Sequence, residues 1–323
     1  MGIKSNISSE LYYNYFAAAS HDAGNPPPPP PIIWYGARGV VAGGHKGGQG
    51  NLSRIDYFAI ASAGNASSFG SLTAARGYLA GVTNASRGCF GGGYDNGVTI
   101  DYITISSTGN ATDFGDLTVG AESPAGANDD TRGLFAGKAS PFSNVIQYIT
   151  IATTGNSTDA GDLTSSRAIA AGCSNGTLAV FAGGNVGGSQ TNIIDYVTIQ
   201  STSNATQFGD LTISVQGPSG NDNSDGRGVT GGGWVGSTTN VMNYFEIDTP
   251  GNATDFGDLS VSREYTAPAT NGTRGTWSGG SDGNGSTNHN EIDYVTISTT
   301  GNATDFGDLT DPSFLLTGTS GDS

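Results

Sequence analysis

The chain has 323 residues, of which 53 are glycine, and its 12 basic and 28 acidic residues give a net charge of −16. Charged residues make up only 12% of the sequence, about half of the ~25% usual in soluble domains. So acidic a chain does not bind nucleic acid by neutralising phosphates, and no apolar run approaches the ~20 residues of a membrane-spanning helix. Two cysteines, Cys89 and Cys173, provide neither a disulfide framework nor a zinc site, so we expect no metal and no cofactor.

Residues 1–37 differ in composition from the rest of the chain and are predicted to form an N-terminal arm. Residues 11–20 read LYYNYFAAAS, and residues 26–31 are six consecutive prolines. A proline run forms an extended helix rising about 3.1 Å per residue, which predicts a semi-rigid spacer of roughly 19 Å. We predict that the aromatic cluster anchors the chain to a partner through Tyr12, Tyr13, Tyr15 and Phe16. The alternative is an arm that folds back onto its own chain.

Residues 38–323 contain one unit that recurs six times. Each copy has a tyrosine, an aromatic residue or alanine twelve positions later, and a leucine three positions after that. The six repeat tyrosines, spaced 45, 46, 48, 48 and 50 residues apart, are Tyr57, Tyr102, Tyr148, Tyr196, Tyr244 and Tyr294. A glycine-rich apolar run precedes each tyrosine, and another short apolar stretch follows each leucine. Four short strands per unit, separated by Gly, Asn and Ser turns, are typical of a propeller blade, so the chain predicts an all-β, six-bladed β-propeller.

The phase of the repeat predicts how the ring closes. The first unit starts with its second strand, RGVVAGG, so it lacks a first strand. After the last repeat leucine, Leu309, the chain continues only with TDPSFLLTGTSGDS. We predict that residues 314–319 form the missing strand of the first blade, which leaves no open sheet edge.

Length differences among the copies are concentrated in the loop between the second and third strands. The interval from the glycine pair to the tyrosine ranges from 9 residues (Gly93 to Tyr102) to 14 residues (Gly280 to Tyr294). Propeller topology places these six loops on one face of the disc, beside the connections between blades. Variable loops on a rigid scaffold commonly carry recognition, so we predict a ligand-binding face. Its exposed candidates are Tyr94, Phe142, Trp234 and His289. The alternative is neutral drift in solvated loops.

These features resemble the Kelch-repeat family, whose blades carry an arginine early in the first strand and a glycine pair ending the second. A tyrosine in the third strand and an aromatic residue three before an apolar residue in the fourth complete that pattern. The chain matches it with Arg76, Arg167 and Arg263, with pairs such as Gly43-Gly44, and with its Phe-Gly-Asp-Leu ends. Phe stands where the family usually has Trp, and Lys138 replaces a glycine in the third copy. The resemblance covers residues 38–323 and implies the fold, whereas propellers host unrelated functions.

The sequence does not favour an enzyme. Its three histidines fall in the arm and in two distant blades, and no acid–base or metal cluster is evident. We predict that the Asp-Phe-Gly triplets form turns of the outer strand whose carboxylates cap backbone amides, with calcium binding as the alternative. They begin at Asp113, Asp255 and Asp305. The Gly-Asn-Ala-Thr sequons are likewise predicted to be turns, because the first residues lack the apolar core of a signal peptide.

The repeated GNATDFGDLT blocks, the low lysine content and the acidic balance resemble the Kelch-like propellers encoded by phages of marine bacteria, especially cyanophages. That resemblance implies a virion structural protein, present in several copies, whose arm binds other virion proteins of the capsid, neck or tail. The loop face would then contact host-surface glycan, with neither nucleic acid nor membrane as a partner. The alternative is a free bacterial carbohydrate-binding or adhesive propeller, which requires a secretion route.

Overall fold

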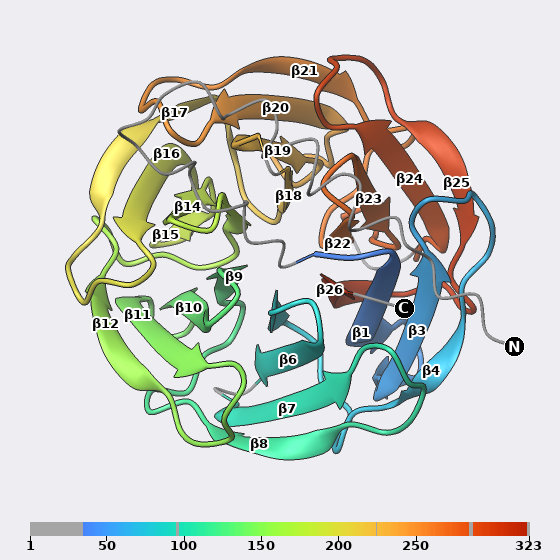
Figure 1. Ribbon diagram of the computed structural model, residues 1–323. Helices are drawn as coiled ribbons and strands as arrows, with labels where there is room; N and C mark the ends of the chain where they lie inside the picture. Colours follow the sequence, from blue (N-terminus) through green and yellow to red (C-terminus); the bar gives the residue numbers. More distant parts are fainter. Residues whose placement is uncertain (1–34, 95–96, 224, 284–286, 322–323) are drawn as a thin grey trace, which may run out of the picture. The chain divides into compact units, whose positions relative to one another are not determined.

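A computed structural model describes residues 35–94, 97–223, 225–283 and 287–321. These residues form six antiparallel sheets arranged in a ring (Figure 1), which confirms the predicted six-bladed β-propeller. The innermost strands line the cavities of a central channel. The predicted anchor residues of the arm lie outside the described residues. Within the described ranges, no helix is both long enough and apolar enough to cross a membrane.

In each blade the four main strands follow one another from the innermost, next to the channel, to the outermost. Blade 1 consists of β26 (Phe314–Gly321), β1 (Arg38–Lys46), β3 (Arg54–Ala59) and β4 (Ser67–Ser71), with the short β2 (Gly50–Asn51) beside β1. Blade 2 consists of β5 (Leu79–Thr83), β6 (Arg87–Gly92), β7 (Thr99–Thr104) and β8 (Thr112–Asp116). Blade 3 consists of β9 (Ala125–Asn128), β10 (Arg132–Lys138), β11 (Ser143–Thr150) and β12 (Thr158–Asp162).

The remaining three blades follow the same order around the ring. Blade 4 consists of β13 (Ala171–Ser174), β14 (Leu178–Ala182), β16 (Ser189–Thr198) and β17 (Thr206–Val215), with the short β15 (Asn185–Val186) beside β16. Blade 5 consists of β18 (Ser219–Asp222), β19 (Arg227–Gly231), β20 (Val241–Glu246) and β21 (Thr254–Asp258). Blade 6 consists of β22 (Ala267–Thr270), β23 (Arg274–Ser278), β24 (Glu291–Thr296) and β25 (Thr304–Asp308).

The ring is closed by the C-terminal strand, as predicted. Strand β26 pairs antiparallel with β1 in a register that runs from Arg38 opposite Gly321 to His45 opposite Phe314. Blade 1 therefore takes its innermost strand from the end of the chain and its other strands from the start. Figure 1 shows the red β26 beside the blue β1.

The innermost strands pack backbone against backbone around the channel, which explains glycine at their centres. A Cβ added to Gly172 would lie 1.9 Å from the carbonyl oxygen of Gly126 in the neighbouring blade. One added to Gly318 would lie 1.8 Å from the carbonyl oxygen of Pro268. Any side chain at these two positions would force the inner strands apart.

The apolar core lies between neighbouring blades. One cluster joins Val40, Ile55 and Phe69 of blade 1 to Phe90 and Ile103 of blade 2. In five blades, the repeat tyrosine meets the phenylalanine twelve residues later edge to face, as in Tyr57 and Phe69 with ring centroids 5.9 Å apart, whereas blade 3 has Ala160 at that position. Burying one such side chain contributes about 1.5–3 kcal/mol. The constant interval of twelve residues therefore reflects the register of the two outer strands.

The sequon asparagines link each blade to the one before it. The side-chain carbonyl of Asn110 accepts a hydrogen bond of 3.1 Å from the backbone N–H of Ser71, at the end of the outermost strand of blade 1. The equivalent acceptors in the other turns are Asn65, Asn156, Asn204, Asn252 and Asn302. The prediction of turn residues is confirmed, and the structure adds that each one stabilises a contact between blades.

Two sequence-based placements need correction. The Asp-Phe-Gly residues Asp113, Asp255 and Asp305 are exposed within β8, β21 and β25, and the described residues give their carboxylates no hydrogen bond. Their predicted capping of backbone amides is therefore wrong. The Kelch-like arginines Arg76, Arg167 and Arg263 precede the innermost strands and lie in the connections between blades, not in first strands.

Candidate functional site

The loops between second and third strands lie beside the connections between blades, as predicted. The backbone N–H of Gly44, near the end of β1, donates a 2.9 Å hydrogen bond to the carbonyl of Arg76 in the adjoining connection. The other five blades repeat this bond, from Gly93 to Ala121, Lys138 to Arg167, Gly184 to Val215, Gly233 to Arg263 and Gly280 to Ser313. We call the surface formed by these loops and connections the loop face.

Beneath the loop face, each blade buries one polar side chain immediately before its repeat tyrosine. In blade 4, Asp195 accepts hydrogen bonds from the hydroxyl of Thr164, at 2.7 Å, and from the backbone N–H of the same residue. The equivalent acceptors are Asp56, Asp101, Gln147, Asn243 and Asp293. These groups fix the connection that enters each blade.

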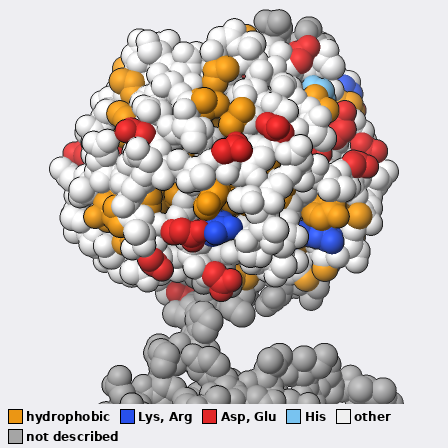
Figure 2. All heavy atoms as spheres, turned by 90° about the horizontal axis from the view of Figure 1, so that it is seen from above, with side chains coloured by type: hydrophobic (Ala, Val, Ile, Leu, Met, Phe, Trp, Pro, Cys, Tyr) orange, Lys and Arg blue, Asp and Glu red, His pale blue; other side chains and the backbone are white. Residues whose placement is uncertain are grey.

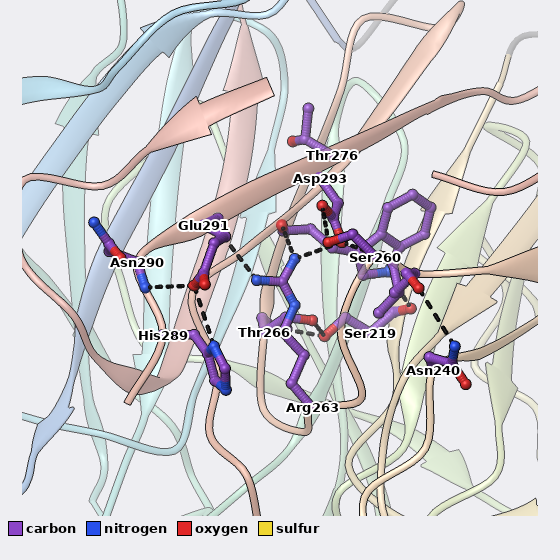
Figure 3. Close-up of polar contacts among 12 residues, drawn as sticks. Ser219, Asn240, Ser260, Arg263, Thr266, Thr276, His289, Asn290, Glu291 and Asp293 are labelled. Atoms are coloured by element: carbon purple, nitrogen blue, oxygen red, sulfur yellow. Dashed lines mark hydrogen bonds and ion pairs between the residues drawn. The ribbon is translucent and has the colours of Figure 1, made fainter. Parts of the chain in front are cut away.

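In five blades, the charge of this acceptor matches the residue four positions after the preceding repeat leucine; in blade 1 that residue is Ser313, and Asp56 pairs with Arg54 at 3.0 Å instead. Arg76, Arg167 and Arg263 occupy that position and pair with Asp101, Asp195 and Asp293 at 2.6, 3.1 and 3.0 Å; Figure 3 shows the last pair. Where the acceptor is uncharged, as in Gln147 and Asn243, the arginine is replaced by Ala121 and Val215. Burial lowers the pKa of the Arg167 guanidinium, and Asp195 opposes that shift. The matched charges indicate that these groups stabilise the connections between blades.

Two of the four predicted ligand-binding residues are exposed on the loop face. The side chain of Tyr94 is 61% exposed, and its ring stacks on that of Tyr78 with centroids 6.3 Å apart and planes 25° apart. Phe142 is 36% exposed in the corresponding loop of blade 3. Their exposure agrees with the prediction, and their binding role stays a prediction.

The other two predicted residues are less accessible than expected. Trp234 is half-buried, because its ring occupies the space beside Gly283 in the loop of blade 6. The side chain of His289 is 12% exposed, and its Nδ1 lies 3.1 Å from Oε2 of Glu291 (Figure 3). The expected exposure is therefore wrong for His289 and overstated for Trp234. The four residues come from blades 2, 3, 5 and 6 and do not form one cluster.

Sequence reasoning missed the ring of residues at the mouth of the channel on the loop face. One residue per blade, six positions after each repeat leucine, adopts a positive φ between 57° and 69°. The backbone N–H of Tyr78 donates to the carbonyl of Leu315, and four further bonds of this kind continue around the ring. The six residues are Tyr78, Ser123, Ile169, Gly217, Tyr265 and Leu315. Their constant distance from the leucine is the signal that could have identified them.

These six residues line a cavity, which we call the channel mouth. It encloses about 630 Å³ of empty volume, part of it open to solvent. The rings of Tyr78 and Tyr265, from blades 2 and 6, meet edge to face with centroids 5.8 Å apart and planes at 82°. Burial and the nearby carboxylates of Glu122 and Glu264 raise the pKa of both phenols. Burial raises the pKa of Glu264 itself to about 7.

The opposite end of the channel is polar. A second cavity there, with about 500 Å³ of empty volume, is lined by Tyr35 and by the last residues of the innermost strands, including Asn128, Ser174 and Asp222. Asp222 accepts a 2.8 Å hydrogen bond from the backbone N–H of Ser174, and burial raises the pKa of its carboxyl to about 7. Across the described ranges, no three His, Cys, Asp or Glu residues form a group that could hold a metal ion.

The fold and the site define a closed six-bladed β-propeller with a loop face and a channel mouth that two tyrosines line. No protein-family model matches the chain, and no curated protein matches it either.

Proposed function

We propose that the chain is a structural protein of a phage virion whose propeller displays the loop face for contact with host-surface glycan. The observation that carries this proposal is the exposed ring of Tyr94, stacked on Tyr78 in one of the length-variable loops. The proposed anchor comprises residues 1–37, which bind the capsid, neck or tail. That part of the proposal rests on the aromatic cluster and the proline run of the sequence.

The chemistry of the loop face suits a sugar. An aromatic ring offers a flat apolar surface with a polar edge, which complements the apolar face of a sugar ring. Asn, Ser and Gly residues in the same loops supply hydrogen-bonding groups for its hydroxyls. Burying one aromatic side chain against a ligand contributes on the order of 1.5–3 kcal/mol. Single sites are therefore weak, and several copies on one particle raise the overall avidity.

The polar groups beneath the loop face support a non-catalytic role. Each buried acceptor of the six blades already holds the hydroxyl of a neighbouring connection, as Asp195 holds Thr164. Four of the six also pair with an arginine, and the other two are uncharged amides. A rigid ring with its polar groups engaged in this way favours presentation of a surface over chemistry on a substrate.

Mass spectrometry of purified particles tests the virion role. We expect the full chain as a stoichiometric component and a chain lacking residues 1–25 to fold but to be missing from particles. A chain that lacks only residues 322–323 is the control, because the arm and the described strands are retained. Absence of the full chain from particles would contradict the proposal and favour a free bacterial carbohydrate-binding or adhesive propeller. Normal assembly of the arm deletion would place the anchor on the disc.

A further inference from the structure

The channel mouth presents aromatic rings at an angle to one another. Tyr78 and Tyr265 meet at 82° and form a corner, and the ring of Tyr94 stacks on that of Tyr78. The faces of aromatic rings carry negative electrostatic potential, so they attract cations that lie within about 6 Å of the ring centroid. A corner of two rings contacts a rounded, weakly hydrated cation on two sides.

A carboxylate stands next to this corner. Glu264 directly precedes Tyr265 and is only 6% exposed. Its Oε2 lies close to Gly217, a residue of the cavity wall: a Cβ added to that glycine would be 3.6 Å from this oxygen. Among the described residues, none of the ion pairs involves Glu264. The raised pKa of this carboxyl, about 7, is caused by burial alone. A bound cation would therefore supply the charge that its surroundings lack.

A hydroxyl without a partner lies in the same wall. Ser123 follows Tyr78 around the ring, through a 3.0 Å hydrogen bond from its N–H to the carbonyl of Tyr78. Its Oγ is buried and has no hydrogen-bond partner among the residues that the structure describes. Buried polar atoms are normally paired, so this oxygen indicates a missing ligand or water. A protonated amine would satisfy it through an N–H group, and a choline-type ligand through its hydroxyl.

The net charge of the molecule favours a cationic ligand. The net charge is −16, and Figure 2 shows acidic side chains spread over the surface in view with few basic ones. This charge draws cations and repels anions. Calcium and magnesium take six or more oxygen ligands, whereas two tyrosine rings line this cavity and no group of three His, Cys, Asp or Glu among the described residues could hold a metal ion. An organic cation fits these walls better than a hard metal ion.

We propose that the channel mouth binds an organic ammonium ion, which lies against the rings of Tyr78 and Tyr265 and faces the carboxylate of Glu264. The site takes either a quaternary ammonium headgroup of the choline type or a protonated amine, such as that of a de-acetylated amino sugar. The proposed site lies in the cavity and not in the exposed loops, so ligand binding there does not depend on whether the chain is a virion protein.

Isothermal titration calorimetry on the full chain tests the inference. The probes are choline and glucosamine, each matched with a neutral analogue, 3,3-dimethylbutan-1-ol and N-acetylglucosamine respectively. We expect at least one cation to bind at least about tenfold more tightly than its neutral analogue, which reflects the cation–π and carboxylate contacts. Binding of choline alone identifies the quaternary headgroup, and binding of glucosamine alone identifies the protonated amine. Equal binding of cation and neutral analogue, or no binding of either cation, would overturn the proposal.

Variants assign the binding to the channel mouth. We expect Glu264→Gln and Tyr265→Leu each to weaken cation binding about tenfold, whereas Tyr265→Phe retains it because the ring is kept. Asp113→Asn removes the same charge from the exposed outer strand β8 and should leave the affinity unchanged. Tyr78→Leu replaces Tyr265→Leu if thermal unfolding shows that the latter is not folded. An unchanged affinity in Glu264→Gln, or an equal loss in Asp113→Asn, would overturn the assignment.

Discussion

Nη2 of Arg167 lies 3.1 Å from Oδ2 of Asp195, and both side chains are completely shielded from solvent. Blade 5 has no ion pair here, because the uncharged residues Val215 and Asn243 occupy the equivalent positions. The desolvation cost of a buried ion pair can exceed its Coulomb attraction, whereas a broken pair leaves one charge buried and uncompensated. The chain thus contains its own uncharged counterpart of the pair.

We predict that Asp195→Asn alone destabilises the protein by about 3–5 kcal/mol, because Arg167 then keeps a buried charge without a counterion. The double variant Arg167→Val, Asp195→Asn reproduces blade 5 and should recover most of that loss. Urea unfolding of the two variants beside the wild type measures the difference. A double variant no more stable than the single one would show that the arginine matters through its bonds to the carbonyls of Phe181 and Ile193.

Repeat spacing was sufficient to predict the blades, the closing strand and the side of the disc that carries the variable loops. It failed for the exposure of single loop residues, because exposure depends on neighbouring blades. Trp234 is covered by Gly283, which is close in space and 49 residues away in sequence. The pairing of arginine with aspartate can be predicted by comparing repeats: one has Arg76 with Asp101, whereas the next has the uncharged Ala121 with Gln147 at the same two positions. The channel mouth was missed because its members are small, apolar or aromatic and gather only through the ring topology.

Truncation after Leu309 removes the closing strand and tests the role of β26. The inner edge of β1 then becomes an open, flat edge that is able to pair with other chains. The loss of Asp311 also breaks its 2.7 Å ion pair with Lys46. We expect aggregation or loss of cooperative thermal unfolding, measured by light scattering and calorimetry. Truncation after Gly321 keeps the whole strand and serves as the control; if both truncations melt like the wild type, β26 is not needed to close the ring.

The buried carboxyl of Asp222 makes stability depend on pH. Its pKa is about 7 in the folded protein, whereas the ordinary value, which applies to the unfolded chain, is 3.8. Between about pH 4 and pH 7 the folded state therefore binds more protons than the unfolded state. Stability contributed by this group is therefore present below about pH 4 and is lost as pH rises to about 7. Each unit of pKa shift corresponds to about 1.4 kcal/mol, which predicts a loss of a few kcal/mol.

Asp222→Asn should remove this dependence and raise the melting temperature at pH 8 relative to the wild type. Thermal unfolding of both proteins between pH 4.5 and pH 8 measures the effect. Asp113→Asn provides the matched control, since its carboxylate is exposed. Parallel pH profiles for the wild type and Asp222→Asn would contradict the prediction.

The exposed ring of Tyr94 provides the most direct test of the loop face. Because this side chain is 61% exposed, Tyr94→Ala should change the free energy of unfolding by no more than about 0.5 kcal/mol. Loss of its stacking surface should weaken each glycan contact, and the loss is multiplied over the copies on a particle. We therefore expect particles that carry Tyr94→Ala to adsorb to host cells several-fold less. Particles that carry Val98→Ala, which shortens another exposed apolar side chain in the same loop, should adsorb normally.

Adding Trp234→Ala to Tyr94→Ala should lower adsorption further but also lower stability, because the ring of Trp234 is packed against blade 6. Adsorption of Tyr94→Ala particles equal to wild type would mean that the loop face makes no contact with the host and that the propeller serves the particle as a structural element alone.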